Sequence, residues 1–167
     1  MSATPTVDTT IDTRARSFLV VAIGADAETA RVAREWTTLA EGVAPTTLAV
    51  LDDIDAPSDL ATLADVAGSA RVGVRILVVG GRYDAHRAVA LLREHGALPV
   101  EIQVSVTHAD DLPVYCAHCR DIRRVVGEPG GLVECPGCAR LLEVHDLLAT
   151  AMGCYLASDS RAREVTE

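Results

Sequence analysis

Up to residue 106 the chain alternates short apolar runs with longer stretches in which apolar residues recur every three or four positions. Continuous apolar runs are typical of strands buried on both faces, and the longer stretches have the periodicity of amphipathic helices. The runs predict strands at 18–23, 46–51 and 75–79, and the alternation of apolar and polar residues at 100–106 predicts a fourth strand at the edge of the sheet. The stretches between them predict helices at 28–39, 59–67 and 84–95. Strand and helix therefore alternate, as in a parallel sheet with helical crossovers.

Right-handed crossovers between these elements favour one strand order. We expect an α/β fold with a small open parallel sheet of four strands, in the order 2-1-3-4, and helices on both faces. Such sheets bind ligands beyond the carboxyl ends of their strands, at the switch point where the strand order reverses direction. Here the loop after the first strand has one glycine, Gly24, followed by Asp26 and Glu28. We interpret these acids as stabilising the start of the next helix, so the scaffold is predicted to have lost any nucleotide site.

Four of the five cysteines form two Cys-x-x-Cys pairs separated by fifteen residues, Cys116 with Cys119 and Cys135 with Cys138. This spacing is typical of a zinc ribbon, in which two tight turns place four thiolates at about 2.3 Å from one zinc ion. A glycine-rich turn at 127–131 predicts a hairpin that leads from one pair to the other. Four thiolates leave no open coordination position, so the zinc is expected to be structural. The ribbon is expected to span 113–146.

Two alternatives to a zinc site are considered for these thiols: disulfides and an iron site. Disulfides are disfavoured because no secretion signal is recognisable before them and a reducing cytosol opposes disulfide formation. Iron, held as in rubredoxin, is the less favoured metal because rubredoxins are rich in aromatic residues and this chain has one Trp, three Tyr and one Phe. His118, between two ligands, is expected to face the surface and not the metal. Cys154 lies in an apolar stretch and is expected to be a packed thiol.

Charge and composition narrow the choice of partners. The net charge of −9 argues against a nucleic-acid partner. No apolar run reaches the roughly 18 residues that a membrane span requires, so no membrane association is expected. Residues 1–16 are rich in Thr, Asp and Ala and are expected to form a flexible tail, with the cytoplasm as the expected location. The sequence contains no Ser/His/Asp set and no phosphate-binding loop, so no catalytic or cofactor-binding residue is assigned.

The end of the chain, 147–167, is expected to form a helix followed by a tail. Three apolar side chains recur at helical spacing within 147–156: Leu148, Met152 and Tyr155. A helix with such a stripe packs on its own ribbon or on a partner. Together with His118 and Arg120 on the ribbon, these three residues form the expected interface.

Several stretches of the sequence together resemble the small zinc-ribbon subunit of bacterial dimethylamine monooxygenase. The most specific is Pro-Val-Tyr-Cys-Ala-His-Cys-Arg at 113–120, followed by Val-Glu-Cys-Pro-Gly-Cys at 133–138 and Leu-Leu-Glu-Val-His-Asp at 141–146. The resemblance includes 74–81 and 153–156, and so covers nearly the whole chain. The α/β half, 17–112, is also similar to the NAD-binding half of ferredoxin reductases without one strand–helix unit, which makes it a degenerate reductase-like domain.

The resemblance implies a place in a multicomponent, haem-dependent enzyme that demethylates amines by oxidation. In such enzymes a large haem subunit oxidises the amine, and a reductase with FMN and a 2Fe–2S cluster supplies electrons from NADPH. The small subunit belongs to the same complex. This chain is then expected to be a non-catalytic subunit that docks on the haem subunit, the reductase or both. The alternatives are a free-standing zinc-ribbon adaptor or regulator, and a small rubredoxin-like electron carrier with iron at the thiolates.

Overall fold

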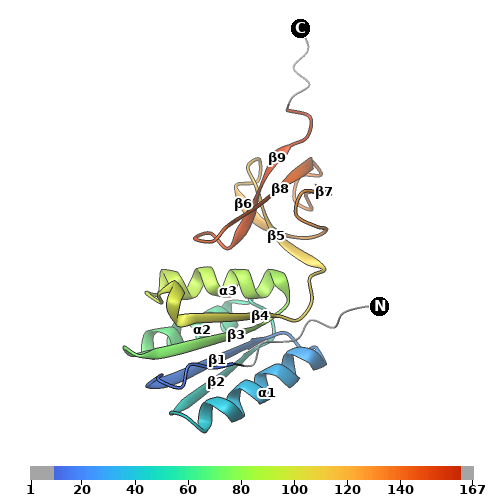
Figure 1. Cartoon of the computed structure of the whole chain (residues 1–167). Helices are drawn as coiled ribbons and strands as arrows, with labels where there is room; N and C mark the ends of the chain where they lie inside the picture. The colour runs from blue at the N-terminus through green and yellow to red at the C-terminus, as the bar shows by residue number, and fades with distance from the viewer. Residues whose placement is uncertain (1–9, 163–167) are drawn as a thin grey trace.

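Two β-sheets, one wholly parallel and one mixed, make up this computed structural model, which describes residues 10–162 (Figure 1). The strands of the parallel sheet are β1 (Ser17–Ile23), β2 (Thr46–Leu51), β3 (Val74–Gly80) and β4 (Ile102–Val106). The helices are α1 (Ala27–Glu41), α2 (Pro57–Ser69), α3 (Arg82–Glu94) and a 3-10 helix, η1 (Pro99–Glu101). The strand order is β2-β1-β3-β4, so the predicted α/β fold and topology are confirmed.

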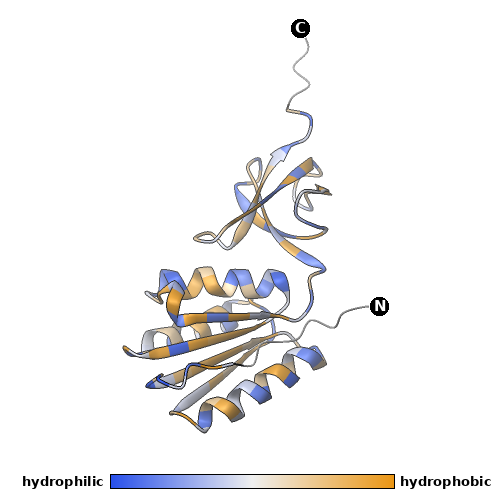
Figure 2. Ribbon diagram, viewed as in Figure 1, coloured by the Kyte–Doolittle hydropathy of each residue, from blue (hydrophilic) through white to orange (hydrophobic). Residues whose placement is uncertain are grey.

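The helices cover both faces of the parallel sheet, α1 on one face and α2 with α3 on the other (Figure 1). On the α1 face Trp36, which has no exposed surface, packs against Phe18 and Leu77. On the opposite face Leu63 of α2 and Leu92 of α3 pack against alternate strand residues. Figure 2 shows the matching alternation of hydrophobic and hydrophilic residues along α1 and α3. The central strands β1 and β3 are therefore buried on both faces, as their apolar runs predict, whereas β2 and β4 at the sheet edges are partly exposed.

Helix α1 begins where the sequence predicts its start. Asp26 is the N-cap, and its carboxylate accepts a hydrogen bond from the backbone N–H of Thr29 at 2.8 Å. Glu28 lies in the first turn and forms a 2.7 Å ion pair with Arg31. A cap satisfies a free N–H, and an acid in the first turn stabilises the positive end of the helix dipole. Both acids therefore serve the helix, in agreement with their interpretation from the sequence.

The second sheet is built around the cysteine pairs and has the strand order β6-β5-β9-β8-β7. Its strands are β5 (Asp111–Cys116), β6 (Asp121–Val126), β7 (Leu132–Glu134), β8 (Leu141–Ala149) and β9 (Cys154–Asp159). β5 pairs antiparallel with β6, and β7 with β8, so each cysteine pair is the turn of its own hairpin. The predicted hairpin between β6 and β7 is wrong. Residues 127–131 instead connect β6 and β7, the two outermost strands of the sheet. The tight hairpin turns are those that carry the cysteine pairs, between β5 and β6 and between β7 and β8, because there they bring the thiolates together.

The predicted C-terminal helix at 147–156 is also wrong, because this segment forms the end of β8, a turn and the start of β9. Gly153 in that turn has a φ of +65°, which a right-handed helix does not allow. β9 lies within the sheet, parallel to β5 and antiparallel to β8. An isolated helix shorter than about 12 residues is marginal in water, whereas this strand has two partners. The second sheet therefore extends past the predicted ribbon boundary at residue 146.

The segment before β1 is part of the α/β half. Of the predicted flexible tail, residues 1–9 lie outside the described residues. Residues 10–16 contact the α1 face of the sheet through Ile11 and Ala15. Asp12 forms a 3.0 Å ion pair with Arg75 of β3. The tail prediction is therefore wrong for residues 10–16, because their apolar side chains have a core to pack on.

The second sheet rests on α3, which lies between the two sheets (Figure 1). One place of contact is the turn between β8 and β9. There Arg87 Nη1 donates a 2.7 Å hydrogen bond to the carbonyl oxygen of Met152. The rings of His86 and Tyr155 meet edge to face with their centroids 6.2 Å apart. A side chain at Gly153 would overlap the backbone of α3, so glycine allows the turn to approach the helix.

Candidate metal centre

The four cysteines of the two pairs converge at one point in the second sheet. Their sulfur atoms all lie within 4.8 Å of one another. The separation is 3.8 Å between Cys116 and Cys138, and 3.7 Å between Cys119 and Cys135. In a tetrahedron with metal–sulfur bonds of about 2.3 Å, the sulfur atoms are about 3.8 Å apart. The cluster therefore fits a tetrahedral metal ion, and it leaves no coordination position for a substrate.

Each cysteine pair and the residue that follows it form the same local turn, which we call a knuckle. In the first knuckle the N–H of Arg120 donates to the carbonyl of Cys116 at 2.8 Å, and in the second that of Ala139 donates to Cys135 at 2.8 Å. Arg120 and Ala139 have φ values of 55° and 59°. This left-handed conformation costs about 1–2 kcal/mol for a residue with a side chain. Because both knuckles share it, the strain belongs to the geometry that aims two thiolates at one point.

The backbone of the second knuckle stabilises the thiolate form of Cys135. Burial acts to raise the pKa of Cys135, but the backbone amides of Gly137 and Cys138 donate to its sulfur and lower the pKa to about 7. Burial raises the pKa of Cys119, and the neighbouring thiols raise it further. Metal binding requires thiolates and releases their protons. Cys135 therefore offers an anionic ligand near neutral pH, whereas a metal ion that binds Cys119 must displace a more tightly held proton.

Two arginines lie beside the sulfur cluster. A divalent ion with four thiolates has a net charge of −2, which a nearby cation stabilises. A Cβ added at Gly137 would lie 3.0 Å from the sulfur of Cys119 and 3.1 Å from Nη2 of Arg123, so the guanidinium is packed against the ligand turn. The pKa of Arg140, just after the second knuckle, is raised mainly by its hydrogen bond to Asp159, with a smaller contribution from the charges of Cys138 and Cys116. Both arginines therefore offset the charge of a metal-loaded centre.

The predicted interface residues lie in two separate places. His118 and Arg120 are exposed on the first knuckle, and His118 is not among the clustered ligands. Leu148 and Tyr155 face each other across β8 and β9, and Tyr155 is half-buried against α3. Met152 lies in the turn and is 41% exposed. The prediction of one helical stripe through Leu148, Met152 and Tyr155 is therefore wrong, because Tyr155 serves a contact within the chain.

The fifth cysteine lies apart from the metal ligands. Cys154 has no exposed surface, and burial raises the pKa of its thiol. A buried, protonated thiol is a poor nucleophile and behaves as a small apolar side chain. Cys154 is therefore a packing residue, as its apolar neighbourhood in the sequence suggests.

The carboxyl edge of the parallel sheet, where its strands end, is filled by residues of the chain itself. His108 follows β4 and lies so close to Gly81 that a Cβ added there would be 2.6 Å from His108 Nε2. The carbonyl of His108 accepts a 2.9 Å hydrogen bond from the N–H of Arg82. The Nε2 atom of the His108 side chain lies 3.9 Å from the carboxylate of Asp26. Because β1 and β3 meet here, His108 occupies the switch point at which such sheets bind ligands.

We expect this edge not to bind a dinucleotide. A pyrophosphate would need bare amides at the start of α1, where Asp26 is the cap, and His108 covers the approach to Gly81. Isothermal titration calorimetry with NADH, NADPH, FMN and FAD is expected to give no binding heat. A micromolar isotherm with any of the four would contradict this and would indicate a working reductase-like site.

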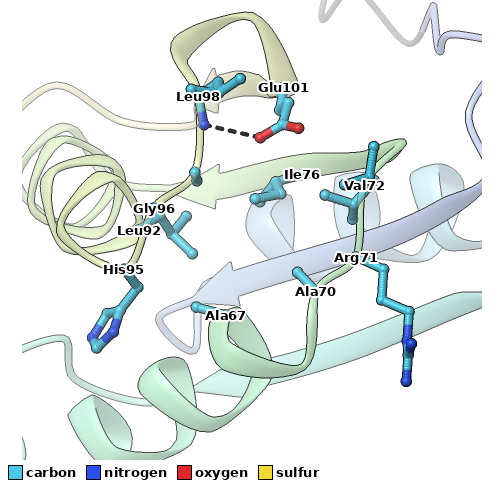
Figure 3. Close-up of a pocket in the computed structure, with 12 residues that line it drawn as sticks. Ala67, Ala70, Arg71, Val72, Ile76, Leu92, His95, Gly96, Leu98 and Glu101 are labelled. Atoms are coloured by element: carbon cyan, nitrogen blue, oxygen red, sulfur yellow. Dashed lines mark hydrogen bonds between the residues drawn. The ribbon is translucent and has the colours of Figure 1, made fainter.

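A hollow lies at the opposite edge of the parallel sheet, between the ends of α2 and α3 (Figure 3). Its volume is about 320 Å³, and Ala67, Ile76 and Leu92 line its apolar centre. Arg71 and His95 also line it but point away from that centre in Figure 3. Ligand pockets of about 300–1,000 Å³ fix their ligands with a few converging polar groups. The described residues around this hollow supply no such convergence, so we assign no ligand to it.

Comparison with known proteins finds no matching family model, no matching curated protein and no matching solved structure. Within the described part of the chain, no helix is long and apolar enough to cross a membrane. What the chain does must therefore be inferred from its own residues and geometry.

Proposed function

We propose that this chain is a non-catalytic subunit of a multicomponent, haem-dependent monooxygenase that oxidises amines, of the oxidative N-demethylase type. Its partners are the haem-containing catalytic subunit and the reductase with flavin and a 2Fe–2S cluster. One observation carries the proposal: the closed four-cysteine centre lies within the stretch, beginning at 113–120, by which the chain most resembles the small subunit of such enzymes.

The geometry supports a docking role better than a catalytic one. The four thiolates close the coordination sphere of the metal, which is typical of structural sites. The edge at which α/β sheets bind ligands is filled by His108 and capped at Asp26. These features support a role in which the chain acts through its surface.

We infer that the metal is one structural zinc ion held by the four cysteines. Zinc favours tetrahedral sites of four thiolates and has no redox chemistry. Native mass spectrometry with elemental analysis is expected to find one zinc ion per chain in a colourless protein. A red protein with one iron per chain would contradict zinc and would favour the rubredoxin-like electron carrier.

The first knuckle is the proposed docking surface. His118 and Arg120 are exposed there, and the two ligands on either side of His118 hold the backbone in place. An arginine on a rigid turn loses little freedom when it binds a carboxylate of a partner, and arginine is enriched at the energetic centres of interfaces.

Isolation of the native protein under mild conditions is expected to yield haem and flavin absorption together with this chain. Arg120→Glu is expected to keep the metal but lose the haem partner, because the charge at the docking surface is reversed. Arg34→Glu, an equal charge change at an exposed site on α1, is the matched control and is expected to keep the partner. A stable, metal-loaded monomer that never co-purifies with haem would contradict the proposal and favour a free-standing zinc-ribbon adaptor.

A further inference from the structure

Strand β6 connects the metal centre to the parallel sheet, because its alternate side chains face opposite ways. Val125 belongs to the core of the second sheet, and Arg123 packs against the second knuckle. On the other face, Ile122 contacts the core between the parallel sheet and α3, and Arg124 bonds to Asp84 of α3. The strand begins directly after the first knuckle, so its position depends on the metal ligands.

Arg124 of β6 makes polar contacts with α3 and with the neighbouring strand β5. Its Nη2 donates to Oδ1 of Asp84 at 2.9 Å, and its Nη1 donates to Oδ2 of Asp111 at 3.1 Å. Asp84 is only 7% exposed. Burial raises the pKa of Asp84, and the hydrogen bond from Arg124 partly offsets that rise. Withdrawal of Arg124 would leave a buried carboxyl without its charged partner, which proteins disfavour strongly.

The surroundings of Arg124 suit a guanidinium group. The guanidinium carbon lies 3.9 Å from the centroid of the Tyr83 ring, a favourable cation–π distance. The hydroxyl of Tyr83 donates to Asp55 at 2.9 Å, which fixes the ring. Carboxylate oxygens of Asp53 and Asp55 lie 4.0 Å from Nη2 of Arg124. A flat cation is thus held between one ring face and several carboxylates at the carboxyl edge of the parallel sheet.

We propose that the metal centre and the seating of the second sheet on α3 form one latch, closed by Arg124. With metal bound, the first knuckle fixes β6, and β6 presents Arg124 to Tyr83 and Asp84. When the metal leaves, β6 is released and the guanidinium withdraws. This latch does not depend on the identity of any partner subunit.

Thermodynamic linkage makes the latch testable in both directions. If metal binding favours the closed contact of Arg124, the closed contact must favour metal binding by the same factor. Coupling between two sites in one protein is typically 5–150-fold. Loss of the Arg124 contacts should therefore weaken metal binding, although Arg124 is not a ligand.

Zinc affinity of the full chain, measured by competition with a chromophoric chelator, tests the first direction. Arg124→Gln is expected to bind one zinc ion about tenfold more weakly than the unmodified chain, within the range of such couplings. Arg124→Lys keeps the charge but cannot donate to two carboxylates at once. Its zinc affinity is expected to lie between those of Arg124→Gln and the unmodified chain. Arg34→Gln removes an exposed arginine from α1 and is expected to match the unmodified chain.

Hydrogen–deuterium exchange at residues 82–88, the start of α3, tests the second direction. Removal of zinc from the unmodified chain is expected to speed exchange there, and zinc-loaded Arg124→Gln is expected to show part of the same increase. If Arg124→Gln does not fold, Arg124→Lys supplies both measurements. The latch would be overturned if the Arg124 variants bound zinc within twofold of the unmodified chain. It would also be overturned if the exchange rate at 82–88 did not change on metal removal.

Discussion

A chain in which serine replaces Cys135 is expected to lose its metal and unfold its second sheet while the parallel sheet stays folded. Cys135 is 1% exposed and belongs to the core of the second sheet, so a ligand and a core residue are lost together. Structural zinc contributes about 10–16 kcal/mol of apparent folding free energy in zinc-finger peptides, more than so small a core supplies alone. Elemental analysis should show no metal, and circular dichroism should keep the signal of α1, α2 and α3.

The parallel sheet is expected to survive because its two hydrophobic cores are separate from the core of the second sheet. Its melting temperature should still fall, because α3 loses the cover of the second sheet. Cys154→Ser is the matched control: it buries a hydroxyl at a cost of about 1–3 kcal/mol but removes no ligand, so the metal should stay. An intact second sheet without metal, or loss of all helical signal in Cys135→Ser, would contradict this prediction.

The parallel sheet could be predicted because its signals are local and agree with one another. Val20 and Val21 point to opposite faces of β1, and both have no exposed surface, so a continuous apolar run is what this strand requires. Crossover handedness then favours the order that the structure shows. The cysteine cluster could be predicted for a similar reason, because two ligands three positions apart meet at one point within a single turn.

The second sheet could not be predicted in detail because its strand pairing is not local. Leu148 and Tyr155 are seven positions apart, which suits the same face of a helix as well as a cross-strand pair. The strand pairing depends on β5, more than thirty residues earlier, which accepts β9 as a parallel neighbour. Likewise Arg124 reads as a surface charge in the sequence, and its contacts with Tyr83 and Asp84 exist only once the two sheets are packed. In the sequence His108 lies in the linker between the two sheets, and nothing near it indicates that it covers the end of β3. The one related signal is Gly81, where only a residue without a side chain leaves room for the His108 ring.

Gly153→Ala is expected to lower the free energy of unfolding by about 3 kcal/mol or more, because strain and overlap add. The φ of +65° alone costs about 1–2 kcal/mol for alanine. In addition, the new Cβ would lie 2.8 Å from the Cβ of Ala90 and overlap the carbonyl of His86. The turn between β8 and β9 would have to move away from α3, which would expose Cys154. Urea denaturation, followed together with the rate at which Cys154 reacts with a thiol reagent, measures both effects.

Gly130→Ala separates the two contributions, since Gly130 lies in the connection between β6 and β7 with a φ of +83° and nothing within 4 Å of an added Cβ. This variant should lose only the backbone term of about 1–2 kcal/mol and should leave Cys154 unreactive. The difference between the two alanine variants then reports how firmly the second sheet is seated on α3. Equal losses in the two variants, with Cys154 protected in both, would contradict this prediction and would mean that α3 and the turn accommodate the added methyl group without separating.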